Sequence, residues 1–123
     1  MTILSPNFIT LFVSDPLASG TFYAGLLGLQ PVKQSPTFVM FAFPNEICLG
    51  LWSNKTAQPK VTAPAGGSEI AFTEKNVDAV YAHWKKLGVT IAQEPTNNEA
   101  GRTFVALDPD GHRIRVFWQE KEN

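Results

Sequence analysis

The chain has 123 residues, of which 44% are hydrophobic, a length and composition typical of one globular domain with a buried core. Its ten basic and eleven acidic residues give a net charge of -1, so it lacks the positive field that attracts a nucleic-acid backbone, and we expect no nucleic-acid partner. Cys48 is the only cysteine, which excludes an intrachain disulfide and a cysteine-rich zinc site.

The first half of the chain predicts a strand, a helix and three further strands. Phe8 to Val13 is rich in β-branched and aromatic residues, which favours a strand. Asp15 and Pro16 are typical of a helix start and Gly28 of a helix end, so we expect a helix over residues 17–27. Its apolar stripe is expected to comprise Ala18, Phe22, Tyr23, Leu26 and Leu27. Short strands are then expected at 30–34, 38–43 and 47–52.

The same pattern returns after a linker at about residues 54–67, which is rich in Lys, Pro, Thr, Ala and Gly. Asn76 predicts the start of a helix over 77–87, whose apolar face contains Val77, Val80, Tyr81, Trp84 and Leu87. Strands are expected at 69–73, 90–94, 102–107 and 114–118. The fold class is therefore α+β, with two βαβββ modules in tandem within one domain, at about 6–53 and 68–119. Each helix covers one sheet face, so we expect the other faces to curve around a shared cleft.

A hairpin turn is predicted near the end of the chain at Asp108-Pro109-Asp110-Gly111. Pro109 presets φ for the second residue of a turn, and Gly111 accepts the positive φ that closes it. In the strand that follows, alternation places Arg113, Arg115 and Phe117 on one face and Ile114, Val116 and Trp118 on the other. An arginine between apolar neighbours either reaches solvent or lines a cavity that holds an anionic or aromatic group.

Several motifs, in order, resemble the signatures of the glyoxalase, bleomycin-resistance and extradiol-dioxygenase superfamily, also called the vicinal oxygen chelate fold. They are Phe22-Tyr23-x-x-Leu26-Leu27-Gly28, Glu69-Ile70-Ala71-Phe72, Leu87-Gly88-Val89 and Asp108-Pro109-Asp110-Gly111-His112-x-Ile114. The resemblance spans about residues 6–119 and implies the tandem-module fold. The superfamily includes lyases, dioxygenases, thiol transferases and non-catalytic drug-binding proteins, so the fold alone does not specify the activity.

The resemblance also indicates where metal-using members hold their ion. They place a ligand on the first strand of each module and a carboxylate on the last, and the matching residues here are Phe8, Glu69 and Arg115, with Gly50 at the equivalent position in module one. A phenyl ring and a glycine donate no electron pair, and a guanidinium repels a cation. We therefore expect neither a metal nor another cofactor.

An aromatic and cationic cavity is expected in place of the metal. If the family's ligand positions face inwards, a period of two adds neighbouring residues on the same surface, and flat aromatic ligands gain stacking energy between such rings. Thr103 is included by the resemblance and Phe41 by the internal repeat. The expected ligand-binding residues are Phe8, Phe41, Trp52, Glu69, Thr103, Arg115 and Phe117.

The favoured function is a metal-independent protein of the bleomycin- and phenazine-resistance type, which sequesters a planar aromatic small molecule. Two alternatives stay open. One is a glyoxalase-like lyase or another enzyme of the superfamily, with a metal held through unexpected ligands or with Glu69 as a base on a carbon acid, and the other is a non-catalytic interaction module. No catalytic residue is assigned, because Cys48 has no histidine nearby in the sequence and reads as a small buried residue. The start of the chain lacks a signal-peptide pattern, so we expect a cytoplasmic protein without a membrane partner. The resemblance implies a homodimer.

Overall fold

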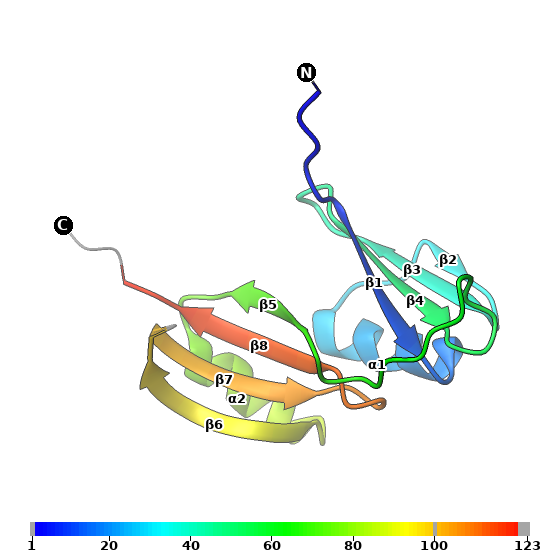
Figure 1. The fold of residues 1–123 in the computed structure, drawn as a ribbon. Helices are drawn as coiled ribbons and strands as arrows, with labels where there is room; N and C mark the ends of the chain where they lie inside the picture. The colour runs from blue at the N-terminus through cyan, green and yellow to red at the C-terminus, as the bar shows by residue number, and fades with distance from the viewer. Residues whose placement is uncertain (1, 100, 121–123) are drawn as a thin grey trace. The chain divides into compact units, whose positions relative to one another are not determined.

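The structure, a computed structural model, describes residues 2–99 and 101–120. The chain divides into two compact units, Met1–Ala63 and Pro64–Asn123, which we call module one and module two (Figure 1). Each contains one helix and one four-stranded sheet in the order βαβββ. The predicted α+β class and the two tandem modules are therefore confirmed.

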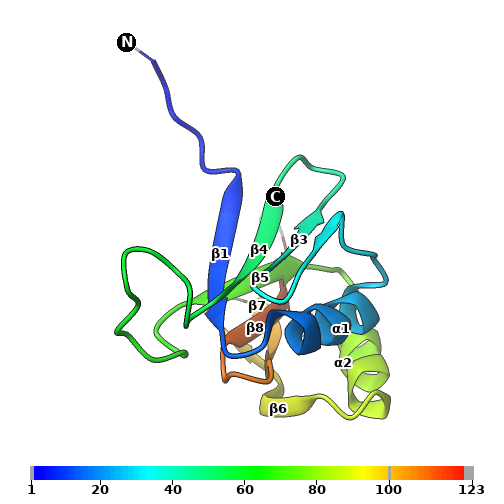
Figure 2. The same ribbon diagram turned by 90° about the vertical axis from the view of Figure 1, so that its right-hand side faces the viewer.

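Module one consists of β1 (Phe8–Val13), α1 (Pro16–Leu27), β2 (Lys33–Gln34), β3 (Phe38–Ala42) and β4 (Cys48–Ser53). Its strands lie in the order β1-β4-β3-β2, and only the β1 and β4 pair is parallel. Figure 2 shows β1 and β4 running side by side. All of the predicted elements are present, although β2 is shorter than the sequence indicated.

Helix α1 begins and ends as predicted, and its buried face matches the predicted stripe in part, since Tyr23 and Leu26 are buried. The Oδ1 atom of Asp15 accepts a hydrogen bond from the Ala18 N–H at 3.2 Å, and Gly28 closes the helix with a φ of 65°. Ala18, which was expected in the apolar stripe, is exposed. A Cβ atom on Gly20 would lie 3.0 Å from a methyl of Val39, so glycine at this position allows the helix to approach β3 closely. The buried residues are Pro16, Ser19, Gly20, Tyr23 and Leu26.

Module two repeats this topology with β5 (Glu69–Thr73), α2 (Val77–Lys86), β6 (Thr90–Asn98), β7 (Gly101–Leu107) and β8 (Arg113–Trp118). The strand order is β5-β8-β7-β6, and again only the first pair is parallel. Strand β6 continues past Pro95, where the sequence predicted that it would end at Glu94. A proline is tolerated there because β6 is an edge strand and its register shifts between Gln93 and Thr96.

The core of module two lies between α2 and the sheet. Trp84 is 4% exposed and Phe104 fully buried, and their rings meet edge to face with centroids 5.4 Å apart. Tyr81 contacts Phe104 from a second side at 5.5 Å. These contacts confirm the predicted core role of Trp84. Leu87 is 51% exposed, because the helix ends at Lys86, so its predicted place on the buried face is wrong.

The predicted hairpin turn connects β7 and β8. The Oδ1 atom of Asp108 accepts hydrogen bonds from the backbone N–H groups of Asp110 and His112, both at 2.9 Å, and Gly111 has a φ of 92°. This turn fixes the register that places Leu107 opposite Arg113. Among the described residues, none of the helices is both long enough and apolar enough to cross a membrane.

Candidate functional site

Each sheet has one face covered by its helix and a second face that we call the open face. In module one, Val39 contacts the helix, and residues of the same parity along the strands are buried. The strand registers show that the alternate residues of β1, β3 and β4 lie together on the opposite, open face. The open face of module one therefore carries Phe8, Thr10, Phe12, Phe38, Met40, Ala42, Cys48, Gly50 and Trp52.

Aromatic rings gather on this open face around Gly50. A Cβ atom built on Gly50 would lie 2.8 Å from the Phe8 ring and 3.0 Å from the Phe38 ring, so both rings occupy the space that a side chain would need. Trp52 lies beside Phe12 with ring centroids 6.0 Å apart and a tilt of 34°. Phe8 remains 46% exposed. This face therefore offers π-surfaces to a flat molecule.

Phe41, one of the predicted ligand-binding residues, is not on the open face. It is fully buried and shares the parity of Val39, which places it in the core beneath α1. The prediction for this residue is wrong, because a shift of one position along a strand moves a side chain to the opposite face of the sheet. Phe38 and Met40 occupy the open face of β3 instead.

The open face of module two is polar and charged where that of module one is aromatic. The registers place on it Glu69, Ala71, Thr73, Thr103, Val105, Leu107, Arg113, Arg115 and Phe117. Four of the predicted ligand-binding residues are in this set: Glu69, Thr103, Arg115 and Phe117. Thr103 is fully buried, although it has the expected orientation.

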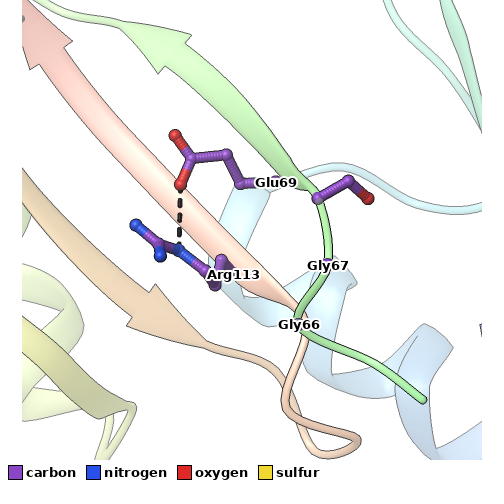
Figure 3. A pocket seen from close by; sticks show the side chains of 5 residues that line it. Gly66, Gly67, Glu69 and Arg113 are labelled. Atoms are coloured by element: carbon purple, nitrogen blue, oxygen red, sulfur yellow. Dashed lines mark ion pairs between the residues drawn. The ribbon is translucent and has the colours of Figure 1, made fainter.

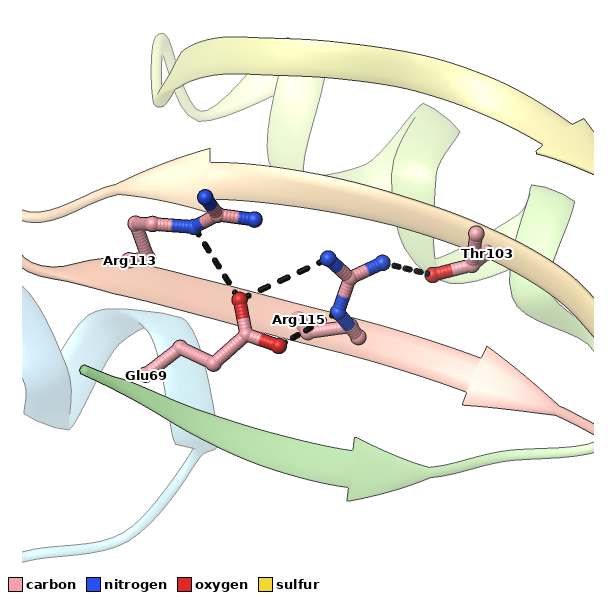
Figure 4. Close-up of polar contacts among 4 residues, drawn as sticks. All are labelled: Glu69, Thr103, Arg113 and Arg115. Carbon is pink, nitrogen blue, oxygen red and sulfur yellow. Dashed lines mark hydrogen bonds and ion pairs between the residues drawn. The ribbon is translucent and has the colours of Figure 1, made fainter. Parts of the chain in front are cut away.

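Arg115 and Arg113 hold the Glu69 carboxylate from two sides (Figure 4). The Nε atom of Arg115 donates to Oε1 of Glu69 at 2.6 Å, and its Nη1 atom donates to the Thr103 hydroxyl at 2.9 Å. The Nε atom of Arg113 lies 3.0 Å from the other carboxylate oxygen. Arg115 therefore positions Glu69 on the sheet. The Glu69 carboxylate in turn neutralises most of the positive charge of Arg115.

The two arginines set the protonation state of Glu69. The hydrogen bond from Arg115 is the main cause that lowers the Glu69 pKa, and the positive charges of both arginines lower it further, while partial burial opposes them. The carboxylate is therefore ionised at neutral pH and is a weak base. A general base works best with a pKa near the working pH, so this arrangement argues against Glu69 as a base.

The lowered pKa gives a prediction about acid stability. Because the folded pKa lies below the ordinary value of 4.5, the unfolded state binds more protons, and the contribution of Glu69 to stability is present above pH 4.5 and is lost as the pH falls through the folded pKa. The unfolding free energy, measured from about pH 6 to about pH 3, should fall less steeply for Glu69→Gln than for the wild type. Arg115→Gln should show the same flattening, because it removes the main cause of the shift. Parallel curves for all three proteins would contradict the assignment.

Two hollows flank Arg113 on module two. The first, of about 310 Å³, is lined by Gly66, Gly67, Ser68, Glu69 and Arg113 (Figure 3). The second, of about 330 Å³, is lined by Ala92, Gln93, Asn98, Val105, Leu107, Arg113 and Arg115. Both are within the range of small-molecule sites. Arg113 is the residue that the two hollows share.

The positions that the resemblance assigns to a metal are Phe8, Gly50, Glu69 and Arg115. The registers support the equivalence of Gly50 and Arg115 in the two modules. Gly50 lies opposite Thr10 on β1, and Arg115 lies opposite Ala71, at the corresponding position of β5. Only Glu69 is a metal-ligand type, and both of its oxygens already face arginines. Within residues 2–99 and 101–120, no group of three or more His, Cys, Asp or Glu side chains could hold a metal ion. These residues do not fit a divalent ion.

The structure thus brings Glu69, Thr103 and Arg115 into contact and places Phe8 and Trp52 on one open face. Sequence reasoning left Arg113 and Phe38 out of the site. The alternation of Arg113 with Arg115 and Phe117 was a signal for the first. For the second, no signal in the sequence fixed the register of β3 against β4.

Comparisons with known proteins give one family model and several similar proteins. The family model described as Glyoxalase/Bleomycin resistance protein/Dioxygenase superfamily matches residues 5–116. The chain is 32% identical over 119 residues to the phenazine antibiotic resistance protein EhpR of Enterobacter agglomerans, covering 92% of this chain and 91% of that protein. It is 30% identical over 118 residues to the glutathione transferase FosA of Serratia marcescens, covering 91% and 79%. A solution NMR structure of a protein from Agrobacterium tumefaciens has a TM-score of 0.86 at 44% identity, covering 97% and 100%.

Proposed function

This chain belongs to the Glyoxalase/Bleomycin resistance protein/Dioxygenase superfamily, and on that premise we propose that it is a metal-independent protein that sequesters a planar aromatic small molecule. The observation that carries the proposal is the aromatic open face of module one. Phe8 and Phe38 meet over Gly50, and Trp52 lies on the same face. A flat ring system gains both apolar burial and stacking energy on such a surface.

The two relatives are named for different functions. One of them is named for resistance to phenazine antibiotics, and phenazines are flat and aromatic. The other is named as a glutathione transferase, which keeps an enzymatic function as the alternative. The donor set at the metal positions and the ion-paired state of Glu69 favour the binding function.

Thermal-shift measurement with phenazine and acridine tests this function directly. A ligand that binds only the native state raises its stability by RT ln(1 + [L]/Kd), so the melting temperature should rise with ligand concentration. Tryptophan fluorescence should be quenched over the same concentration range. An unchanged melting temperature up to the solubility limit of both compounds would contradict the proposal.

The proposed metal-independent function predicts the metal content of the purified protein. Protein prepared without chelators should carry much less than one first-row transition metal per chain, because Glu69 is the only ligand type among the four expected positions. Elemental analysis by mass spectrometry is the measurement, and the same analysis after dialysis against EDTA is its control. One tightly held Zn²⁺, Mn²⁺ or Fe²⁺ per chain would refute metal-independence.

The family resemblance also predicts the assembly state. We propose a homodimer, which is the commonest closed assembly of soluble proteins. Light scattering at micromolar concentration should give a mass close to twice the chain mass of 13.5 kDa. A mass equal to that of one chain would show that the proposal is wrong.

A further inference from the structure

The cluster on the open face of module two carries an excess of positive charge. One carboxylate, Glu69, faces two guanidinium groups, Arg113 and Arg115, so the sum of the three charges is +1. None of the other residues that line the two hollows is charged. The cluster is therefore complementary to an anion of small size.

Arg113 is the member of the cluster that can still bind an anion. Its side chain is 44% exposed, whereas that of Arg115 is 16% exposed and is held by Glu69 and Thr103. The contact of Arg113 with Glu69 is made through Nε. Figure 4 shows its two terminal nitrogens directed away from the Glu69 carboxylate. Because Glu69 fixes Nε, the guanidinium is oriented with its remaining donors available.

The surroundings of Arg113 differ between its two sides. One hollow is lined by Ser68 and two glycines beside the ion pair, and Figure 3 shows the glycines and the ion pair. The other offers the apolar side chains of Val105 and Leu107 together with the Gln93 amide. A molecule with an apolar body and one oxyanion group matches this combination of an apolar wall, an amide and a cation.

We propose that Arg113 is the anchor of an oxyanion subsite on module two, which binds the carboxylate or phosphonate group of a small apolar molecule. The terminal guanidinium nitrogens donate charge-assisted hydrogen bonds to the oxyanion, and Leu107 contacts the apolar body. This inference goes beyond the proposed function, because it concerns the charge of the ligand and uses residues of module two alone. It also moves to Arg113 the anion-binding role that the sequence suggested for Arg115.

Three naphthalene probes test the subsite: 2-naphthoate, 2-naphthylphosphonate and the neutral 2-naphthamide. Each is titrated into the ¹⁵N-labelled full chain, and the Nε–Hε signal of Arg113 and the indole N–H signal of Trp52 are followed separately by NMR. At least one anionic probe should bind about tenfold more tightly than the amide and should shift the Arg113 signal. The stronger of the two anions identifies the preferred oxyanion.

Two variants complete the experiment. Arg113→Gln should abolish the preference for the anion, and it leaves the Glu69 and Arg115 pair in place. Arg102→Gln is the matched control, since Arg102 is similarly exposed and ion-paired, with Asp78, and this variant should keep the preference. Loss of the preference for the anion in both variants would mean that it arises from the overall charge of the protein, and this result would overturn the proposal.

The two NMR reporters separate this inference from the proposed function. A shift of the Trp52 signal without one at Arg113 would overturn the oxyanion subsite and leave the aromatic proposal standing. A shift at Arg113 alone in the wild type, together with loss of the anion preference in Arg113→Gln, would support the subsite and count against stacking at Trp52. An unchanged Arg113 signal at millimolar concentrations of both anions would also overturn the subsite.

Discussion

Trp52→Ala should weaken the binding of a planar aromatic ligand by about 1–3 kcal/mol, a factor of roughly 5 to 150, because apolar burial and ring stacking are both lost. Trp52 lies on the open face, beside Phe12, and outside the core beneath α1. The variant should therefore fold. Calorimetric titration with phenazine, together with the melting temperature of the free protein, measures the two effects separately.

Trp84→Phe is the matched control for this prediction. Trp84 is 4% exposed and packs on Phe104, so its replacement should lower stability and leave the ligand affinity of the folded protein unchanged. Trp52→Phe should retain part of the affinity, because a smaller ring can still stack. If Trp52→Ala lowered the melting temperature and left the affinity unchanged, Trp52 would be a structural residue and the open face would not be the binding surface.

Phe104→Ala should lower the unfolding free energy by about 3–5 kcal/mol, which is the largest stability effect that we expect from one side chain. Phe104 is fully buried and meets both Tyr81 and Trp84 edge to face, so the change removes apolar burial and two aromatic contacts and leaves a cavity. Urea unfolding followed by circular dichroism measures the loss.

Phe8→Ala makes the same substitution on an open face and serves as its control. Phe8 is 46% exposed and packs over Gly50, where no deep cavity can form. Its removal should cost less than about 1 kcal/mol of stability. Similar losses for the two variants would mean that the helix-side and open faces of the sheets are not energetically distinct.

The charged cluster shows what alternation along a strand can predict and what it cannot. The sequence placed Arg113, Arg115 and Phe117 on one face of β8, and the structure confirms this. The sequence could not predict which arginine has which role, because the roles depend on which guanidinium lies nearer Thr103 on the adjacent strand. Both arginines contact Glu69, but Arg115 also donates to Thr103 and is 16% exposed, whereas Arg113 is 44% exposed.

The sequence by itself determined the two βαβββ modules, the caps of α1 and the turn at Asp108, because these features depend on residues close together in the chain. Only the tertiary structure decided the face of Phe41, the close approach of α1 to β3 at Gly20, and the contact of Glu69 with two arginines. These depend on the register between strands and on the helix that covers them. A single step in register exchanges the buried and open faces, and no local pattern in β3 specifies that step.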